Sequence, residues 1–560
     1  MFFKQLRKLL QTKASVLVRN LEWQQVLVFL IFCLAVFVRL YNYPDFLYFI
    51  YDQGRDAWKL QEIVSGNLTL IGPTSGLEGF FLGPLWYYLG VPGYVLFGGS
   101  PYGISVWYIV LSLVALPFYW LISKRLFPKE VLWQVTAFAL LSLVVGSVHS
   151  SIFIWNPLIA VPLMAAGQWF MFHARTSRLH LFLAFLSLSF VLQSEFAYGI
   201  FIVPVFFALI FWIRQRVSLI DYGIAGSAVF LTLLPQLAFE VKNNFLMSRA
   251  LVSGTVSSTN ALPLTEILLK RPEQLLQGTA ELLFGSWNGT VLLTMVLLLL
   301  AVVALMWIRK KSQFLHDPAT HYSWQVTALL AIVPYVGFMA WTGNSGHFFS
   351  YYITPHFMFI VPLVLLGVKV APVYLWAKLL SKARCEKVQV ALTTSVVTLL
   401  LVTSWYFVAD TVISPKNEAG MRVIDSAVSQ VMLWEFQDRE HVSVFADIEY
   451  STATATFTPN FLTAQYDYFL HRHAQKLNRP VPYTQVRPED AIVYVIIEPD
   501  REIPEKRFAP WYKKVTDGRV LQRRMHLGVL RLESWAQTEF ANEYKLPSPY
   551  IPTIMEQMCW

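Results

Sequence analysis

Two carboxylates follow the first apolar segment of the chain. Asp52 lies beyond the end of that segment, and Asp56 comes four residues later. If residues 53–64 form a helix, both lie on one face, with Arg55 and Lys59 as local cationic partners. A carboxylate at a membrane surface, held near aromatic cover, can serve as a general base. Residue chemistry alone favours the alternative, in which Asp52 only caps the helix.

The composition indicates where such a base would work. The chain has 560 residues, of which 56% are hydrophobic and 14% are charged. Soluble domains average about 45–50% apolar and 25% charged residues. A cytosolic enzyme, a disordered chain and a collagen-like chain are therefore excluded. Many windows reach the roughly 20 apolar residues that a membrane span needs, which predicts a polytopic membrane protein.

Charge and cysteine content exclude further classes. The net charge of +9 does not indicate nucleic-acid binding, because the basic residues form short clusters between apolar runs. This pattern is typical of cytoplasmic loops. Cys33, Cys385 and Cys559 show no spacing of a metal site or a disulfide framework.

The apolar runs predict an all-α polytopic membrane domain over residues 1–409. Basic clusters then fall on the cytoplasmic side, and the loops 43–100 and 239–289 fall on the outer side. We expect eleven spans, at 23–42, 101–123, 130–148, 157–173, 179–194, 199–213, 219–238, 290–308, 323–341, 353–368 and 388–409.

Whether residues 80–99 span the membrane decides on which side every later loop lies. The segment is apolar enough to span, but it holds five helix-disfavouring Gly and Pro residues between Gly83 and Gly93. Counting it as a span would move every later basic cluster to the outer side. We therefore expect an interfacial or re-entrant element, which also suits its Trp and Tyr residues.

Residues 410–560 form a second unit in which charged residues become frequent. We expect a small, water-soluble α/β domain on the extracytoplasmic side. AGMRVIDSAVSQVMLWEF reads as a helix, and HVSVFAD, AIVYVII and HLGVLRLES each read as a strand. His471 and His473 have the spacing of a metal-binding pair, but without a third ligand a solvated helix face is favoured.

The first outer loop resembles that of the GT-C superfamily of polyprenyl-phosphate-sugar-dependent glycosyltransferases. The nearest pattern is the protein O-mannosyltransferase and lipid A aminoarabinose transferase branch. The resemblance rests on Arg39-Leu40, Asp52-Gln53, Gly83-Pro84-Leu85-Trp86-Tyr87-Tyr88 and Phe97-Gly98. The chain departs from the pattern at Gln53, where many members have Glu, and at Gly83-Pro84, where many have His-Pro-Pro.

The resemblance implies a function. The chain would transfer a sugar, with inversion, from a polyprenyl-phosphate carrier to a protein, lipid or glycan acceptor on the outer face. Asp52 matches the family's catalytic aspartate and would act as the base. We expect a prokaryotic inner-membrane location among membrane lipids, and the scattered basic residues indicate no nucleic-acid partner. It leaves a divalent metal open as a cofactor.

Other polar residues on the outer face are candidate supporting groups. Asp56 and Glu78 would help to position the base, although Glu78 could simply be solvated. Glu195 would face the active cavity or pair with a basic neighbour. His149 and Asn156 flank the loop SVHSSIFIWNP, where the alternative is a capped helix end.

The carrier phosphate would need cations, which are few on the outer face. For the tyrosines among the candidates, an interfacial aromatic belt is the alternative. The candidate phosphate-binding residues are Lys242, Arg249, His347, Tyr351, Tyr352 and His356.

Two other functions compete with this reading. A membrane transporter or a lipid or glycan flippase would show broken helices at corresponding positions of two halves, whereas the Gly/Pro-rich segment occurs once. A glycan polymerase or ligase would place its main catalytic loop late in the chain rather than in the first outer loop.

Overall fold

The protein is described by a computed structural model. It describes residues 22–75, 79–213, 218–256, 262–285, 290–310, 317–339, 341, 348–376, 381–415, 420–434, 442–448, 464–478, 491–498, 512–513, 516–527 and 530–538.

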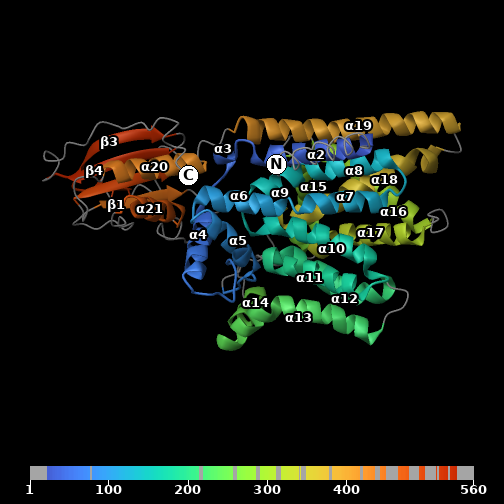
Figure 1. Ribbon diagram of the computed structural model, residues 1–560, viewed down its shortest axis with the longest axis horizontal. Coiled ribbons are helices and arrows are strands. Elements are labelled where there is room, and N and C mark those ends of the chain that lie inside the picture. Colours follow the sequence, from blue (N-terminus) through green and yellow to red (C-terminus); the bar gives the residue numbers. More distant parts are fainter. Residues whose placement is uncertain are drawn as a thin grey trace, which may run out of the picture.

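A bundle of apolar helices, here called the helical body, forms most of the molecule (Figure 1). The helical body comprises α2 (Trp23–Leu40), α6 (Pro101–Ser112), α7 (Ala115–Leu126), α8 (Val131–Leu143), α9 (Val145–Ile152), α10 (Ala160–Ala174), α11 (Arg178–Ser194), α12 (Phe196–Ile213), α13 (Leu219–Lys242), α16 (Thr290–Lys310), α17 (Pro318–Met339), α18 (Phe357–Trp376) and α19 (Lys382–Val408).

Each of the eleven predicted spans falls on one or more of these helices. Among the described residues, eight helical segments meet the length and hydropathy expected of a membrane span, and α8 with α9 makes a ninth if this bent pair counts as one. The helix Arg178–Ser194 is apolar but shorter. The chain is thus a multi-pass membrane protein.

Two long connections are themselves helical. The first contains α3 (Tyr43–Phe46), α4 (Tyr51–Val64) and α5 (Leu85–Leu96), and the second contains α14 (Leu246–Val256) and α15 (Leu264–Phe284). Short helical turns precede α10, precede α18 and follow α19; they are η1 (Asn156–Ile159), η3 (Ser350–His356) and η4 (Ala409–Ile413).

The segment 80–99 contains only the twelve-residue helix α5, with Pro92 inside it. Twelve residues rise about 18 Å, well short of the roughly 30 Å hydrocarbon core. The expectation that this segment is not a regular spanning helix therefore agrees with the structure.

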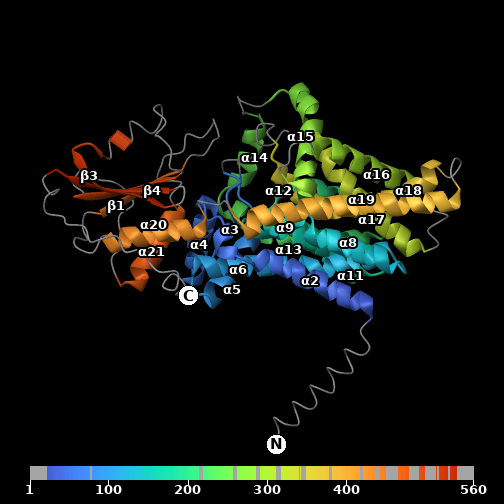
Figure 2. The same cartoon turned by 90° about the horizontal axis from the view of Figure 1, so that it is seen from above.

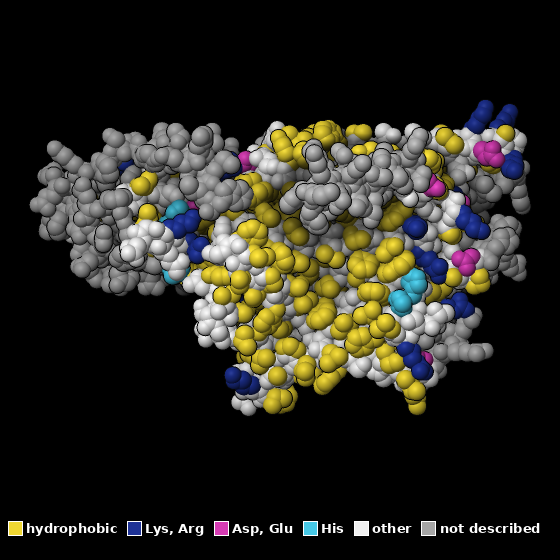
Figure 3. Space-filling model, viewed as in Figure 1, with side chains coloured by type: hydrophobic (Ala, Val, Ile, Leu, Met, Phe, Trp, Pro, Cys, Tyr) yellow, Lys and Arg dark blue, Asp and Glu magenta, His cyan; other side chains and the backbone are white. Residues whose placement is uncertain are grey.

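The helical body has two distinct ends. The C-terminal domain lies beyond one end, with α4 and α5 between it and the body (Figures 1 and 2). The connections α7–α8 and α10–α11 lie at the other end (Figure 1). Hydrophobic side chains cover the middle of the visible face, and most Lys and Arg side chains of the body lie at the end far from the domain (Figure 3).

The C-terminal domain contains a mixed sheet beside two helices. The helices are α20 (Met421–Trp434) and α21 (Ala464–Lys476), and the strands are β1 (Val442–Ile448), β2 (Ile492–Glu498), β3 (Arg519–Leu527) and β4 (Leu530–Gln537). The strand order is β1-β2-β4-β3; β1 and β2 are parallel, and the other two pairs are antiparallel.

One predicted strand was wrong. HLGVLRLES is not a single strand, because it contains the end of β3 and the start of β4, which pair with Leu527 opposite Leu530. Gly528 and Val529 separate them, and a two-residue connection that begins with Gly favours a hairpin. The helix and the other two strands of this domain agree with the prediction.

A buried arginine holds the helical body together where α8 breaks into α9. The two helices meet at an angle of 41°, because Val144 has the non-helical ψ of 149°. Arg39 of α2 donates to the carbonyl oxygens of Ser142 (2.9 Å) and Ser147 (3.0 Å), and to the Ser147 hydroxyl (2.9 Å). It also donates to the carbonyl of Ala35 in its own helix (2.8 Å). Carbonyls at a helix end need such partners when water is excluded.

We expect Arg39→Lys to lower the stability of the folded protein by at least about 2 kcal/mol, because one ammonium cannot reach all four acceptors and a buried unsatisfied carbonyl costs 1–3 kcal/mol. Thermal unfolding in detergent would measure the change. Arg178→Lys is the matched control, since the Arg178 side chain is 55% exposed and a Lys there can still pair with Asp221. Equal melting temperatures for the two variants would contradict the role of Arg39.

Candidate functional site

Asp52 lies in the first turn of α4, one position after its first residue. The helix begins after Ile50, whose backbone N–H donates to the side-chain oxygen Oε1 of Gln53 at 2.9 Å. The interpretation of Asp52 as the N-cap is therefore wrong, because Ile50 occupies the N-cap position and Asp52 is the second residue of the helix. The Asp52 side chain is 31% exposed and its Oδ1 lies 2.8 Å from Nη1 of Arg55.

One guanidinium serves both carboxylates of α4. Arg55 donates to Oδ1 of Asp56 from Nε (2.9 Å) and Nη2 (2.7 Å), while its third nitrogen reaches Asp52. The Tyr51 ring lies 5.7 Å from the guanidinium carbon. Arg55 therefore fixes the relative positions of the two carboxylates on α4.

Asp56 is buried and joins α4 to α5. Its Oδ2 accepts from Nε1 of Trp86 at 2.7 Å, and the Trp86 ring stacks on Tyr108 at 3.9 Å. Burial raises the pKa of the Asp56 carboxyl, and Arg55 opposes that shift. Burial alone would lower the pKa of Arg55, but Asp56 and Asp52 raise it above its ordinary value. Asp56 thus positions the helix from inside, and Asp52 is the carboxylate with access to solvent.

The two departures from the family pattern have local structural roles. Gln53 is buried and donates from Nε2 to the carbonyl of Ile154, which ties α4 to the segment between α9 and η1. At Gly83, a Cβ atom would lie 2.3 Å from Cγ of Gln193. The Gln193 Oε1 accepts from the backbone N–H of Leu85 at 3.1 Å and so holds the start of α5.

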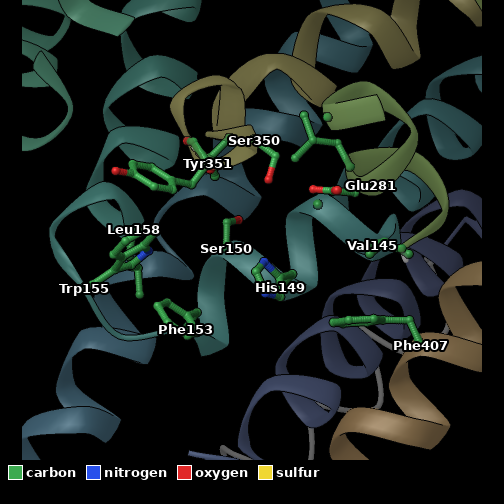
Figure 4. A pocket seen from close by; sticks show the side chains of 15 residues that line it. Val145, His149, Ser150, Phe153, Trp155, Leu158, Glu281, Ser350, Tyr351 and Phe407 are labelled. Carbon is green, nitrogen blue, oxygen red and sulfur yellow. Dashed lines mark hydrogen bonds between the residues drawn. The ribbon is translucent and has the colours of Figure 1, made fainter. Parts of the chain in front are cut away.

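A cavity of about 200 Å³ opens between α9, α15, η3 and α19 (Figure 4). Side chains from these four elements and from the segment after α9 point into it (Figure 4). The residues that line it are Val145, Gly146, His149, Ser150, Phe153, Trp155, Leu158, Gly278, Glu281, Leu282, Gly285, Ser350, Tyr351, Thr354 and Phe407.

Tyr351 lines this cavity from η3. Its ring meets that of Trp155 edge-on at 4.6 Å. Glu195 is buried between α11 and α12 and accepts from the backbone N–H of Ala197. Within the described ranges, no basic residue forms an ion pair with Glu195, and Glu195 does not line this cavity.

His149 and Asn156 have different surroundings. His149 is exposed within the cavity, and its ring lies 5.9 Å from the rings of Phe153 and Phe407. Asn156 instead donates from Nδ2 to the carbonyl of Ser194 at 2.6 Å, at the end of α11. The structure therefore brings His149, but not Asn156, into the cavity.

Lys242 and Arg249 are exposed beside the junction of α13 and α14. Glu240 organises this junction, because its carboxylate accepts from the backbone N–H groups of Met247 (2.7 Å) and Ser248 (2.9 Å). Neither cation lines the cavity. Ala250 of α14 borders the first loop, where a Cβ atom at Gly79 would lie 3.1 Å from the Ala250 methyl carbon.

The remaining candidates are buried or lie outside the described residues. His356 is fully buried, with its ring 4.2 Å from that of Tyr335 and Nδ1 3.3 Å from the Tyr198 hydroxyl. Tyr352 is buried and stacks on Phe338 at 6.0 Å. The turn η3 directs these two side chains inward while Tyr351 faces the cavity. Glu78 and His347 lie outside the described residues.

Sequence analysis missed two charged residues of α15. Glu281 is exposed inside the cavity, although it looks in the sequence like one more acid of an amphipathic helix. Arg271 is fully buried, donates to the carbonyl of Trp341 at 3.1 Å and lies over the Phe348 ring at 5.1 Å. In the part of the chain that the structure describes, no group of three His, Cys, Asp or Glu residues could hold a metal ion.

Comparison with known proteins gives a match at the level of structure. Neither the protein-family models nor the curated protein sequences contain a significant match to the chain. The crystal structure of ArnT from Cupriavidus metallidurans bound to undecaprenyl phosphate is similar to this chain with a TM-score of 0.55 and 12% identity. The apo ArnT structure gives 0.53 and 12%, and each match covers 90% of this chain and 97% of ArnT.

These matches confirm the predicted resemblance at the level of the fold. ArnT is a lipid A aminoarabinose transferase of the GT-C class, the branch that the first outer loop indicated. Over nine-tenths of its length, the chain has an ArnT-like fold.

Proposed function

We propose that the chain is an integral-membrane glycosyltransferase that takes a sugar from a polyprenyl-phosphate carrier and transfers it to an acceptor hydroxyl. The observation that carries the proposal is the position of Asp52. It is a partly exposed carboxylate in the first outer loop, on a helix held by buried hydrogen bonds of Gln53 and Asp56. The ArnT structure with a similar fold was solved with undecaprenyl phosphate, which supports the choice of carrier.

The reaction needs one base and one leaving group. Asp52 accepts the proton of the acceptor hydroxyl while the acceptor oxygen attacks the anomeric carbon. The bond from that carbon to the carrier phosphate oxygen breaks, and the phosphate leaves with the electron pair. A single displacement inverts the anomeric centre and requires no covalent sugar–enzyme intermediate.

The cavity suits a sugar ring. A sugar presents apolar C–H faces and polar hydroxyls, and the cavity offers both aromatic rings and hydrogen-bonding groups. Trp155 and Phe407 supply aromatic surface, and His149, Ser150 and Glu281 supply polar atoms. The acceptor, whether protein, lipid or glycan, would reach the anomeric carbon from the side of Asp52.

The carrier phosphate requires a cation near the bond that breaks. Arg55 is occupied by two carboxylates, and His356 is fully buried. Lys242 and Arg249 are exposed on the segment that borders the first loop. We therefore assign the phosphate to these two residues, with Tyr351 on the side of the sugar.

The proposed topology has eleven spans, with the C-terminal domain on the outer side of a prokaryotic inner membrane. It rests on the gathering of basic residues at the end of the helical body far from the domain (Figure 3). In this arrangement Asp52 and the cavity face the outer leaflet, where a lipid-linked donor would be available.

Asp52→Asn should reduce sugar transfer by about 10² to 10⁴-fold, because the amide cannot accept the proton of the acceptor. The amide oxygen can still accept from Arg55, so melting temperature and donor binding should stay unchanged. Transfer from a radiolabelled polyprenyl-phosphate sugar in membranes would measure the effect. Wild-type turnover in this variant would remove Asp52 from the mechanism and leave only the shared fold.

Arg249→Gln should raise the KM for the donor about tenfold with little change in melting temperature, because a charge-assisted hydrogen bond to phosphate is worth about 1.5–3 kcal/mol. Lys242→Gln should act in the same direction. Lys270→Gln is the matched control, since Lys270 is an exposed cation of α15 that pairs with Glu266 at 2.6 Å. If all three variants have the same donor KM, the phosphate binds elsewhere.

The topology is tested by cysteine labelling in a variant without the three native cysteines. Tyr450→Cys in the C-terminal domain should react with a membrane-impermeant maleimide in intact cells, because the domain lies outside. Lys310→Cys should react only after the cells are permeabilised. The reverse pattern would invert the proposed orientation.

A further inference from the structure

The C-terminal domain packs directly on the helix that carries Asp52. Helices α4 and α21 lie side by side at the junction between the helical body and the domain (Figures 1 and 2). The residues of α4 that contact α21 include Gly54, Trp58 and Gln61, which repeat at helical spacing. They form one face of α4, here called the docking face, and Asp52 precedes it by half a turn.

Gly54 allows the two backbones to touch. A Cβ atom at this position would lie 2.3 Å from the backbone nitrogen of Gln465 and 2.5 Å from the carbonyl carbon of Ala464. The obstructing atoms are backbone, so no rotamer change relieves the clash. Any larger residue must either push α21 away or displace α4.

Trp58 and Gln61 continue the contact along α21. The Trp58 ring meets Tyr468 edge-on at 5.4 Å and lies 4.9 Å from the His471 ring. Nε2 of Gln61 lies 3.2 Å from Nε2 of His471. His471, which the sequence offered as half of a metal pair, thus belongs to this packing contact.

The domain also holds the chain on both sides of α4. On the N-terminal side, Arg422 pairs with Asp45 at 2.9 Å and the Met421 N–H donates to the carbonyl of Leu47 at 2.9 Å. On the C-terminal side, the Tyr468 hydroxyl donates to the carbonyl of Gly99 at 2.7 Å.

A second contact on the C-terminal side reaches the helical body. The Tyr102 hydroxyl of α6 donates to Asp425 at 3.0 Å, and His473 lies 2.6 Å from the same carboxylate. Asp425 of α20 therefore joins α6 of the helical body to α21, so the docked position of the domain is specified by directional bonds as well as by packing.

We propose that α21 is a positioning element for Asp52, so that the active site is incomplete without the C-terminal domain. The inference rests on the proposed role of Asp52. Three supports fix α4: Trp86 holds Asp56 on one side, Ile154 holds Gln53 on another, and α21 presses on the docking face. Without the contact with α21, α4 can rotate about the two remaining contacts, and this rotation changes the position of Asp52 relative to the cavity.

The test compares two Gly→Ala variants of the full-length protein. Gly54→Ala should lower kcat roughly tenfold to a hundredfold, because displacement of a reacting group by about 1 Å has an effect of this size. The donor KM should change less than twofold, since the phosphate-binding residues lie on α13 and α14. Gly223→Ala in α13 is the matched control, because a Cβ atom there meets no atom within 4 Å, and it should behave as wild type.

A second pair of variants covers the case in which Gly54→Ala does not fold. Trp58→Ala removes the ring that packs on Tyr468 and His471, whereas Trp58→Phe keeps an aromatic ring in place. We expect Trp58→Ala to lower kcat at unchanged donor KM, and Trp58→Phe to restore most of it. Equal kcat for Trp58→Ala and wild type would overturn the inference, as would a fall in Tm with unchanged kcat in both Gly54→Ala and Trp58→Ala.

Limited proteolysis separates this inference from the proposed function. Cleavage between the helical body and the domain should become faster in Gly54→Ala and not in Gly223→Ala. If Asp52→Asn is inactive while Gly54→Ala is fully active, the function stands and the positioning role is wrong. If Asp52→Asn is fully active, the proposed function fails, and the positioning role fails with it even where proteolysis shows that the domain has undocked.

Discussion

The cavity depends on the hydrogen bonds that Arg39 donates to the carbonyl oxygens beside the break between α8 and α9. A helix that ends inside a membrane protein leaves carbonyl oxygens without donors, and lipid offers none. Arg39 supplies donors to both sides of the break, at Ser142 and Ser147. The bend of 41° turns α9 so that His149 and Ser150 face the cavity. The chain runs from α2 through the first loop into α4. Arg39 therefore anchors both α2, which leads to the helix with Asp52, and α9, which lines the cavity.

From this anchor, α4 is positioned by contacts of three different kinds. A charged hydrogen bond joins Asp56 to Trp86, an amide joins Gln53 to the segment after α9, and backbone packing joins Gly54 to α21. These contacts use the buried faces of the helix. Asp52 stays partly exposed and shares its cation with Asp56. A base needs such a position, because it must be fixed and still be reachable by the proton that it accepts.

Sequence patterns predicted what depends on local composition. Apolar runs of about 20 residues marked the helices of the body, and clustered Gly and Pro marked residues 80–99 as irregular. Contacts between distant segments could not be predicted in this way. The break at Val144 occurs in an apolar run with no Gly or Pro at the break itself, and Arg39, 103 residues away from Ser142, supplies donors beside it. Glu281, which was not a candidate, lies in the cavity, and the candidate His356 is buried, because the direction of each side chain depends on how α9, α15 and η3 pack.

The charges around the cavity favour binding of a sugar ring over binding of a phosphate. Among the described residues that line it, none is Lys or Arg, whereas Glu281 lines it. A phosphate inside this cavity would meet a carboxylate without a compensating cation, which is unfavourable at low dielectric. A sugar ring carries no such penalty, and its hydroxyls can donate to the carboxylate. Under the proposed function, the sugar of the donor would therefore occupy the cavity and its phosphate would lie outside it.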